Sequence, residues 1–381
     1  MVTKAAVIAA HAAFVLTGTV TTLLGPLLPV LVARWSLDDA RAGYFFTAQF
    51  AGSMAGVAVS GALVSRYGFQ VALSVGLAVM ALGVGGLGLA AWPGALLSVG
   101  CYGIGLGIAI PSTNLFVAEA APHRRSAALN ILNLAWGVGA VLASPVFAWF
   151  AARQRADAFI VGLAAALVAA MVGIVLLASP TQGAERREVQ ATRSGPLRWW
   201  RSPAFLVFGA LFFVYVGTEN ALAGWVALYA QRLDASAAAA STPAFFWAAL
   251  LVGRALAPAL LRWLGEARLV QSGLLLAALG VVLLLTATTL TGVMLSTSVC
   301  GLGLAAVFPT TIAQLSREFA DASARAAAAA FALAGLGGAT VPWLVGAWST
   351  NAGSLRAGLM IPLIGCLAMI TLHAYRSRIT M

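Results

Sequence analysis

This sequence contains few charged residues. Only 9% of its 381 residues are Asp, Glu, Lys or Arg, whereas 61% are hydrophobic, and the mean hydropathy is +0.96. Few water-soluble domains could bury that much apolar surface. The apolar runs are about 20 residues long, which fits spanning helices better than the alternating strands of about 10 residues in a membrane barrel. The sequence therefore predicts an all-α membrane protein, because helices satisfy their own backbone polar groups inside a bilayer.

Cysteine and histidine are scarce as well. The three cysteines all fall in apolar stretches and the three histidines form no cluster, so the sequence indicates neither a disulfide framework nor a metal site. The row Gly103-x-Gly105-x-Gly107 lies inside an apolar stretch with no strand before it, which argues against a phosphate-binding loop. No nucleophile stands with a base in a recognisable pattern. We therefore expect no enzymatic activity, no cofactor and no metal.

Acidic residues are half as numerous as basic ones. The sequence has 11 acidic and 22 basic residues, for a net charge of +11. In a soluble protein this excess would suggest a nucleic-acid partner, but in a membrane protein it reports orientation, since basic residues collect in cytoplasmic connections. We expect a protein of a bacterial inner (plasma) membrane with both termini in the cytoplasm and no nucleic-acid partner. The outer connections then hold only Arg34, Arg41, Arg153, Arg155, Arg232 and Arg356.

A long internal repeat is the most informative feature that is present. The segment 103–113 returns as 301–311, an offset of 198 residues, and Gly139 matches Gly337 in the same register. An apolar chain built as two similar halves has the layout of a secondary transporter. We expect a six-helix bundle over 1–180, a cytoplasmic linker over 181–202 and a second bundle over 203–381. The twelve expected spans are roughly 4–32, 39–65, 70–90, 94–119, 126–150, 156–178, 203–231, 240–262, 269–287, 291–316, 323–347 and 353–375.

Glu219 is the sharpest candidate for chemistry, because it lies near the middle of the span 203–231. A carboxylate at the centre of a bilayer costs about 2.5–3.5 kcal/mol on insertion scales. It must therefore be neutral, be paired with a cation, or face a water-filled cavity. One interpretation is a coupling site for H⁺ or Na⁺. The other is a structural ion pair with Arg254, which lies too deep in the span 240–262 to reach the interface easily. Both roles can coexist if the pair breaks during transport.

Amide and aromatic side chains also gather in a few of the spans. Amides both donate and accept hydrogen bonds, which suits a hydroxyl-rich solute, and aromatic rings offer an apolar face to a sugar. The alternative is ordinary hydrogen bonding between helices, a common use of polar residues in membranes. The candidate substrate-binding residues are Gln49, Asn114, Asn130, Asn133, Trp136, Tyr215, Asn220, Trp225, Tyr229 and Gln314.

Two loops resemble signatures of the major facilitator superfamily. The segment Gly61-Ala-Leu-Val-Ser65-Arg66-Tyr-Gly68 is similar to its helix 2–3 loop, with Ser65 where an acid is usual. The segment from Glu119 to Leu129 is similar to its helix 4–5 junction. The resemblance implies two six-helix bundles that rock about a midplane site. It also implies a cytoplasmic gate around Arg66, Glu119 and Arg125 that stabilises the outward-open form.

Within that superfamily, three segments resemble the fucose permease-like sugar symporters and their sodium-dependent glucose transporter relatives. They are Gly105-Leu-Gly107 with 114–117, the segment 129–140, and the segment 215–229. The resemblance implies a monosaccharide substrate moved with H⁺ or Na⁺. One departure is Ile110, where fucose permease has an acid, and the first span has no acid either. Glu219 is then the main residue left to carry coupling.

Three other functions stay open. A drug or metabolite efflux antiporter is the first, although Ala140 follows Gly139 where such exporters often carry Gly-Pro. A lipid or lysolipid carrier would need a greasier cavity with a lateral opening. A membrane receptor is disfavoured, because the sequence has no sizeable soluble domain. In each case we expect a monomer in the bilayer that binds a small molecule.

Overall fold

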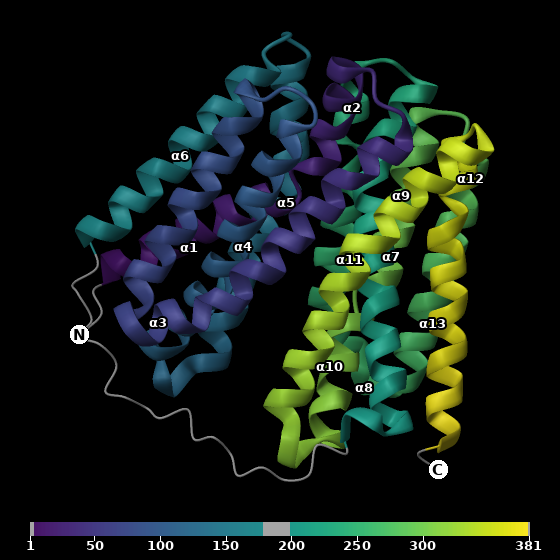
Figure 1. The fold of residues 1–381 in the computed structure, drawn as a ribbon. Helices are drawn as coiled ribbons and strands as arrows, with labels where there is room; N and C mark the ends of the chain where they lie inside the picture. The colour runs from purple at the N-terminus through teal and green to yellow at the C-terminus, as the bar shows by residue number, and fades with distance from the viewer. Residues whose placement is uncertain (1–3, 178–198, 380–381) are drawn as a thin grey trace. The chain divides into compact units, whose positions relative to one another are not determined.

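Every described element is a helix. The computed structural model describes residues 4–177 and 199–379 (Figure 1). Its α-helices are α1 (Lys4–Thr21), α2 (Leu24–Trp35), α3 (Asp39–Leu89), α4 (Gly94–Ala120), α5 (Arg125–Ala151), α6 (Ala156–Leu177), α7 (Pro203–Leu233), α8 (Thr242–Thr286), α9 (Leu290–Leu304), α10 (Val307–Glu318), α11 (Ser323–Ala352), α12 (Leu355–Gly358) and α13 (Met360–Ile379). Short 3₁₀ turns lie at Pro122–Arg124, Trp199–Arg201, Ala237–Ser241 and Ala320–Ala322.

Two of these helices are too long to cross a membrane once. At about 1.5 Å per residue, the 51 residues of α3 would reach about 75 Å, more than twice the thickness of a hydrocarbon core. Each turns back at a glycine instead. Gly68 in α3 has φ 83° and ψ 171°, and Gly265 in α8 has φ 69° and ψ 163°, a backbone region that essentially only glycine adopts. With these turns, the described helices confirm the all-α membrane fold.

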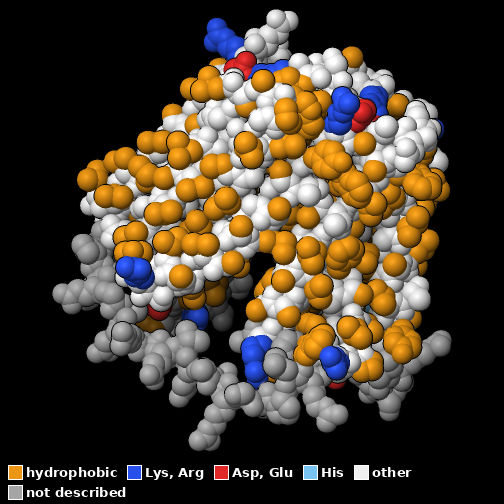
Figure 2. All heavy atoms as spheres, in the orientation of Figure 1, with side chains coloured by type: hydrophobic (Ala, Val, Ile, Leu, Met, Phe, Trp, Pro, Cys, Tyr) orange, Lys and Arg blue, Asp and Glu red, His pale blue; other side chains and the backbone are white. Residues whose placement is uncertain are grey.

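The outer faces of the helices are apolar. In Figure 2 hydrophobic side chains cover the long helices between their ends, and Lys, Arg, Asp and Glu gather at the ends. Leu344 and Trp348 of α11, and Ile364 and Leu367 of α13, are all exposed. Ten helices in the described part of the chain are long and apolar enough to cross a membrane. The protein is therefore a multi-pass membrane protein, since lipid is the solvent that such faces require.

The described chain divides into two compact units. Unit 1 comprises residues 4–24 and 48–177, and unit 2 comprises residues 25–47 and 199–379. Residues 25–47 thus pack with the helices of the second half. Most of the linker expected at 181–202 lies outside the described residues, so the domain boundaries expected from the sequence stay a prediction.

The sequence repeat appears as a repeat in packing. A Cβ atom at Gly139 of α5 would lie 1.9 Å from the carbonyl oxygen of Val15 in α1. A Cβ atom at Gly337 of α11 would lie 1.9 Å from the carbonyl oxygen of Phe213 in α7. The two contacts correspond residue by residue, because Val15 and Phe213, like Gly139 and Gly337, are 198 residues apart. Small residues let membrane helices approach this closely.

Helix α7 holds Glu219 in the core of unit 2. It begins where the Ser202 hydroxyl accepts a hydrogen bond from the N–H of Phe205, and Pro203 occupies its first turn. Most residues from Phe205 to Ala230 are buried, because α8, α9, α10, α11 and α13 all pack against this helix. A charged group on such a helix must find its partners within the protein.

Candidate functional site

Two of the expected spans, 4–32 and 291–316, are each divided into two helices. At each break a polar side chain donates a hydrogen bond to the end of the first helix. Helix α1 ends at Thr21 before α2, and α9 ends at Leu304 before α10. The last carbonyls of a helix lack partners in that helix and must be satisfied within a membrane. The Gln49 amide donates to the Thr21 carbonyl at 3.1 Å, and the Tyr215 hydroxyl donates to the Leu304 carbonyl at 3.2 Å. Broken helices of this kind accompany binding sites in transporters.

Glu219 forms the charged centre of unit 2. Its side chain is 11% exposed, and its oxygen Oε1 accepts a hydrogen bond from the Tyr215 hydroxyl at 2.9 Å. The Nη2 atom of Arg254 lies 3.5 Å from the same oxygen. The structure therefore contains the Glu219–Arg254 contact that the sequence suggested, and it adds Tyr215 as a third member. The coupling role of these residues stays a prediction.

The hydroxyl of Tyr215 can serve two forms of Glu219. A phenol donates one hydrogen bond and can also accept. When Glu219 is ionised, Tyr215 can donate to its carboxylate. When Glu219 is protonated, Tyr215 can donate to the Leu304 carbonyl and accept from the acid. Tyr215 can thus pair with Glu219 in both protonation states, and its single O–H reaches the Leu304 carbonyl only when Glu219 is protonated.

A second polar group lies in unit 1, around Gln49. The Tyr102 hydroxyl donates to Gln49 Oε1 at 2.8 Å, and Trp136 Nε1 donates to the hydroxyl of Thr21 at 3.4 Å. Gln49 is buried and Tyr102 is fully buried. Both ends of the Gln49 amide are therefore engaged by protein groups. Tyr102 was not among the expected residues, and its only signal in the sequence is a hydroxyl within the apolar run 94–119.

The asparagines mostly bond to their own helices. The amide N–H groups of Asn114, Asn133 and Asn220 donate to the carbonyls four residues earlier, at 2.8, 2.9 and 2.8 Å. This pattern is typical of polar residues that satisfy themselves within a helix. Asn130 is exposed on α5. The amide oxygens stay the part of these side chains through which a solute could be bound.

Trp225 and Tyr229 pack in the core of unit 2. Trp225 has no exposed surface, and its indole N–H donates to the Pro342 carbonyl at 2.9 Å. The Tyr229 hydroxyl accepts from Arg356 Nε at 3.4 Å. These contacts give both side chains a packing role, so their expected contact with substrate stays untested.

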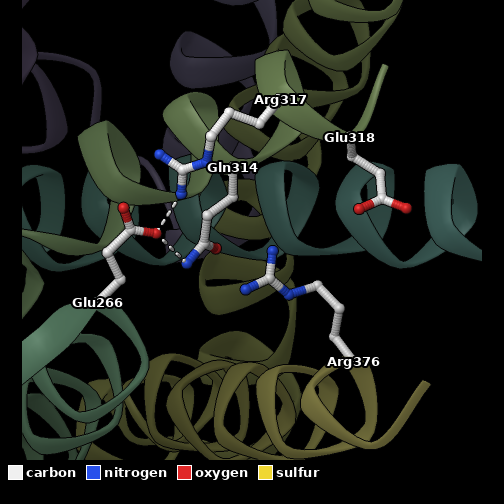
Figure 3. A pocket seen from close by; sticks show the side chains of 5 residues that line it. All are labelled: Glu266, Gln314, Arg317, Glu318 and Arg376. Carbon is white, nitrogen blue, oxygen red and sulfur yellow. Dashed lines mark hydrogen bonds and ion pairs between the residues drawn. The ribbon is translucent and has the colours of Figure 1, made fainter. Parts of the chain in front are cut away.

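Gln314 belongs to a different group from Glu219. It lines a cavity of about 290 Å³ with Glu266, Arg317, Glu318 and Arg376, as Figure 3 shows. Its amide donates to Glu266 Oε2 at 3.0 Å, and Arg317 binds the same oxygen. Burial acts to raise the pKa of Glu266, but the hydrogen bonds from Arg317 and Gln314 and the nearby guanidinium charges hold this pKa below its usual value. The structure thus groups Gln314 with charged residues at helix ends.

The residues of the expected cytoplasmic gate form no ion pair with one another in the described part of the chain. Arg66, Glu119 and Arg125 are all exposed. The Arg66 guanidinium lies over the ring of Tyr67, 5.3 Å from its centroid. A latch among the three stays a prediction for another conformation.

Sequence reasoning missed a buried charge cluster in unit 2. Asp39, 6% exposed, accepts two hydrogen bonds from Arg232, one of them 2.9 Å long, and a third from the Ser349 hydroxyl. We call Asp39, Arg232 and Ser349 the Asp39 cluster. Arg232 and Ser349 lie 193 and 310 residues from Asp39 along the chain. An acid at the first position of an expected span gives no sign that it will be buried, so the sequence held no usable signal.

Comparison with known proteins places the chain in a family. The model of the Major Facilitator Superfamily matches residues 10–342. The 4-hydroxybenzoate transporter PcaK of Acinetobacter baylyi is 31% identical over 145 residues, which is 35% of this chain and 31% of that protein. The multidrug resistance protein 1 of Bacillus subtilis is 22% identical over 306 residues, 77% of each chain.

Solved structures share the fold. A bacterial homologue of the human lysosomal transporter Spinster, in an inward-facing and unoccupied conformation, has a TM-score of 0.78 at 16% identity, over 98% of this chain and 96% of that one. The transporter FucP in its outward conformation has a TM-score of 0.61 at 18% identity, over 97% and 98%. These findings indicate a transporter rather than an enzyme. The chain belongs to the Major Facilitator Superfamily.

Proposed function

We propose that this protein is a cation-coupled secondary transporter that moves a small polar solute by alternating access, with Glu219 as the coupling residue. The observation that carries the proposal is the buried Glu219 carboxylate. One of its oxygens, Oε1, is contacted by both Tyr215 and Arg254, and Tyr215 also contacts the last residue of α9, Leu304. A carboxylate at this depth is costly and is usually functional. H⁺ or Na⁺ bound at Glu219 would neutralise it and release Arg254.

The solute is the less determined part of this proposal. The resemblance to fucose permease-like symporters makes a monosaccharide the first solute to test, and Asn114, Asn133 and Trp136 are the candidate contacts in unit 1. Efflux of drugs or metabolites is the second candidate, favoured by the match to the multidrug resistance protein over 77% of the chain. We further propose a monomer in an inner membrane with both termini in the cytoplasm.

Exchange of Glu219 for glutamine tests the coupling. In proteoliposomes, Glu219→Gln should abolish concentrative uptake driven by an ion gradient and leave counterflow exchange largely intact, because a neutral amide fixes the loaded state. Asp38→Asn, which removes an exposed carboxylate that pairs with Arg41, is the matched control and should keep both activities. Loss of both activities in a folded Glu219→Gln protein would show that Glu219 serves binding or structure, and the coupling proposal would fail.

A further inference from the structure

Arg254 has more hydrogen-bonding capacity than the protein uses. A guanidinium offers five N–H donors in a fixed plane. The Nη2 atom of Arg254 reaches Glu219 at 3.5 Å, the outer limit of a hydrogen bond, and its Nε is buried without a partner in the described part of the chain. In the same unit, Arg232 binds Asp39 with two N–H groups. Arg254 therefore lacks a bidentate acceptor, the kind of partner that its planar guanidinium suits.

The Arg254 side chain is nevertheless accessible. Its side chain is 35% exposed, against 11% for Glu219, so Arg254 is the more open member of the pair. A planar acceptor such as a carboxylate matches the guanidinium fork, and the pairing of two hydrogen bonds adds both energy and orientation.

Aromatic rings extend from Tyr215, the hydrogen-bond donor to Glu219. The Phe308 ring lies 5.5 Å from the ring of Tyr215 and 6.0 Å from that of Phe331. Phe308 is partly exposed and Phe331 is half exposed. Rings at these separations form an apolar surface against which another ring packs favourably. Tyr215, which shares Glu219 with Arg254, thus connects the cation to a set of aromatic rings, a combination that suits an anion with a flat apolar body.

The charges balance only if an anion and a cation bind together. Without solute, Glu219 and Arg254 neutralise each other. A carboxylate added to an ionised site would leave two negative charges around one guanidinium, and an uncompensated buried charge is strongly unfavourable. When Glu219 takes up one H⁺, a solute carboxylate can replace it on Arg254 and the site stays neutral. Binding of each ion then favours binding of the other to the same extent.

The groups that act on Glu219 are few. In the described ranges, Arg254 of α8 is the charged group that interacts with it, and Tyr215 of α7 is its hydrogen-bond donor. Helices α9, α10, α11 and α13 also pack on α7 and place no charged side chain against Glu219. The pH dependence of anion binding should therefore follow Glu219.

We infer that the transported solute is an organic acid, preferably an aromatic carboxylate, whose carboxylate binds Arg254 while Glu219 carries the coupling proton. This inference rests on the proposed function, since it uses Glu219 as the coupling residue. It names the substrate class, which family membership leaves open, and it competes with the monosaccharide that the resemblance to sugar symporters suggests.

Paired ligands test the inference directly on the purified full chain. Binding of benzoate, benzamide, glucuronate and glucose would be measured by calorimetry from pH 5 to pH 8. Benzoate should bind and benzamide should not, and the affinity for benzoate should fall about tenfold per pH unit wherever one proton is taken up with each anion. Glucuronate binding as tightly as benzoate would assign the carboxylate but exclude the aromatic preference.

Variants separate the two proposals. Arg254→Lys should weaken benzoate binding by about tenfold or more, because lysine lacks the planar fork, whereas Arg262→Gln on the exposed face of α8 should leave it unchanged. Glu219→Gln should bind benzoate independently of pH. Benzoate binding that stays pH-independent in the unsubstituted protein would support the substrate class and refute coupling at Glu219. Ion-dependent binding of glucose with no binding of either acid would refute the substrate class and leave the coupling proposal standing.

Discussion

The two buried carboxylates Asp39 and Glu219 differ in how many hydrogen bonds they accept. Asp39 is as deeply buried as Glu219, but it is fully engaged, with three donors from α7 and α11 on its two oxygens. Glu219 has two contacts on one oxygen. A saturated carboxylate holds helices together, whereas an undersaturated one can exchange its partner. This difference favours a structural role for Asp39 and agrees with the coupling role proposed for Glu219.

The Asp39 cluster can be tested by a double-mutant cycle. Asp39→Asn and Arg232→Gln should each lower stability by about 1–3 kcal/mol, less than for a fully buried pair because 42% of the Arg232 side chain is exposed. The double variant should cost less than the sum of the two, with a coupling of about 1–2 kcal/mol. Thermal unfolding in detergent measures this, and additive losses would show that the contact contributes nothing.

At the scale of helices, the repeat is expressed as two matching close contacts. Gly139 and Gly337 sit where α5 meets α1 and where α11 meets α7, each without room for a side chain. The carbonyl oxygens of Val15 and Phe213 belong to helical backbone and cannot turn aside as a side chain could. These positions therefore fix the distance between the helices of each pair.

Adding side chains at these glycines should separate the helices. Gly139→Val and Gly337→Val should each destabilise the protein by about 1–3 kcal/mol or more, the usual cost of overpacking. Gly162→Ala on α6 is the control, since nothing lies within 4 Å of its added Cβ, and it should stabilise the helix by about 0.5–1 kcal/mol. Equal unfolding temperatures for the Gly139→Val and Gly162→Ala proteins would overturn this packing argument.

At the scale of the whole molecule, residues 25–47 are the segment that most concerns transport. They lie within unit 2, where the Thr47 hydroxyl donates to the Ala339 carbonyl at 2.7 Å and Asp39 binds Arg232. Along the chain they belong to the half that contains unit 1. If the proposed alternating access separates the two halves of the sequence, this segment leaves α7 and α11 in another conformation.

A reversible cross-link tests that requirement. In a Thr47→Cys, Ala339→Cys protein, oxidation or a short bifunctional thiol reagent should stop transport, and reduction of a disulfide should restore it. The control is Gly86→Cys with Ser98→Cys, which joins α3 to α4 inside unit 1, where the two positions are in contact. Unchanged transport after complete cross-linking of Thr47→Cys to Ala339→Cys would show that these residues stay together throughout the cycle.

What the sequence determined by itself depends on local or periodic properties. Apolar runs predict helices in lipid because burial of apolar surface adds up residue by residue. The repeat predicts two similar halves, and the cost of charge in a bilayer singles out Glu219 and Arg254. The offset of 198 residues also relates Gly139 to Gly337, and the structure places the two glycines at matching helix contacts.

Only the tertiary structure decided which polar groups meet. Asp39 and Arg232 are 193 residues apart, and nothing in either segment marks the other as its partner. The same holds for the hydrogen bonds of Tyr102 with Gln49 and of Gln314 with Glu266. By contrast, Asn114, Asn133 and Asn220 donate to carbonyls of their own helices. Hydrogen bonds act over about 3 Å and depend on direction, so their partners are fixed by how the helices pack.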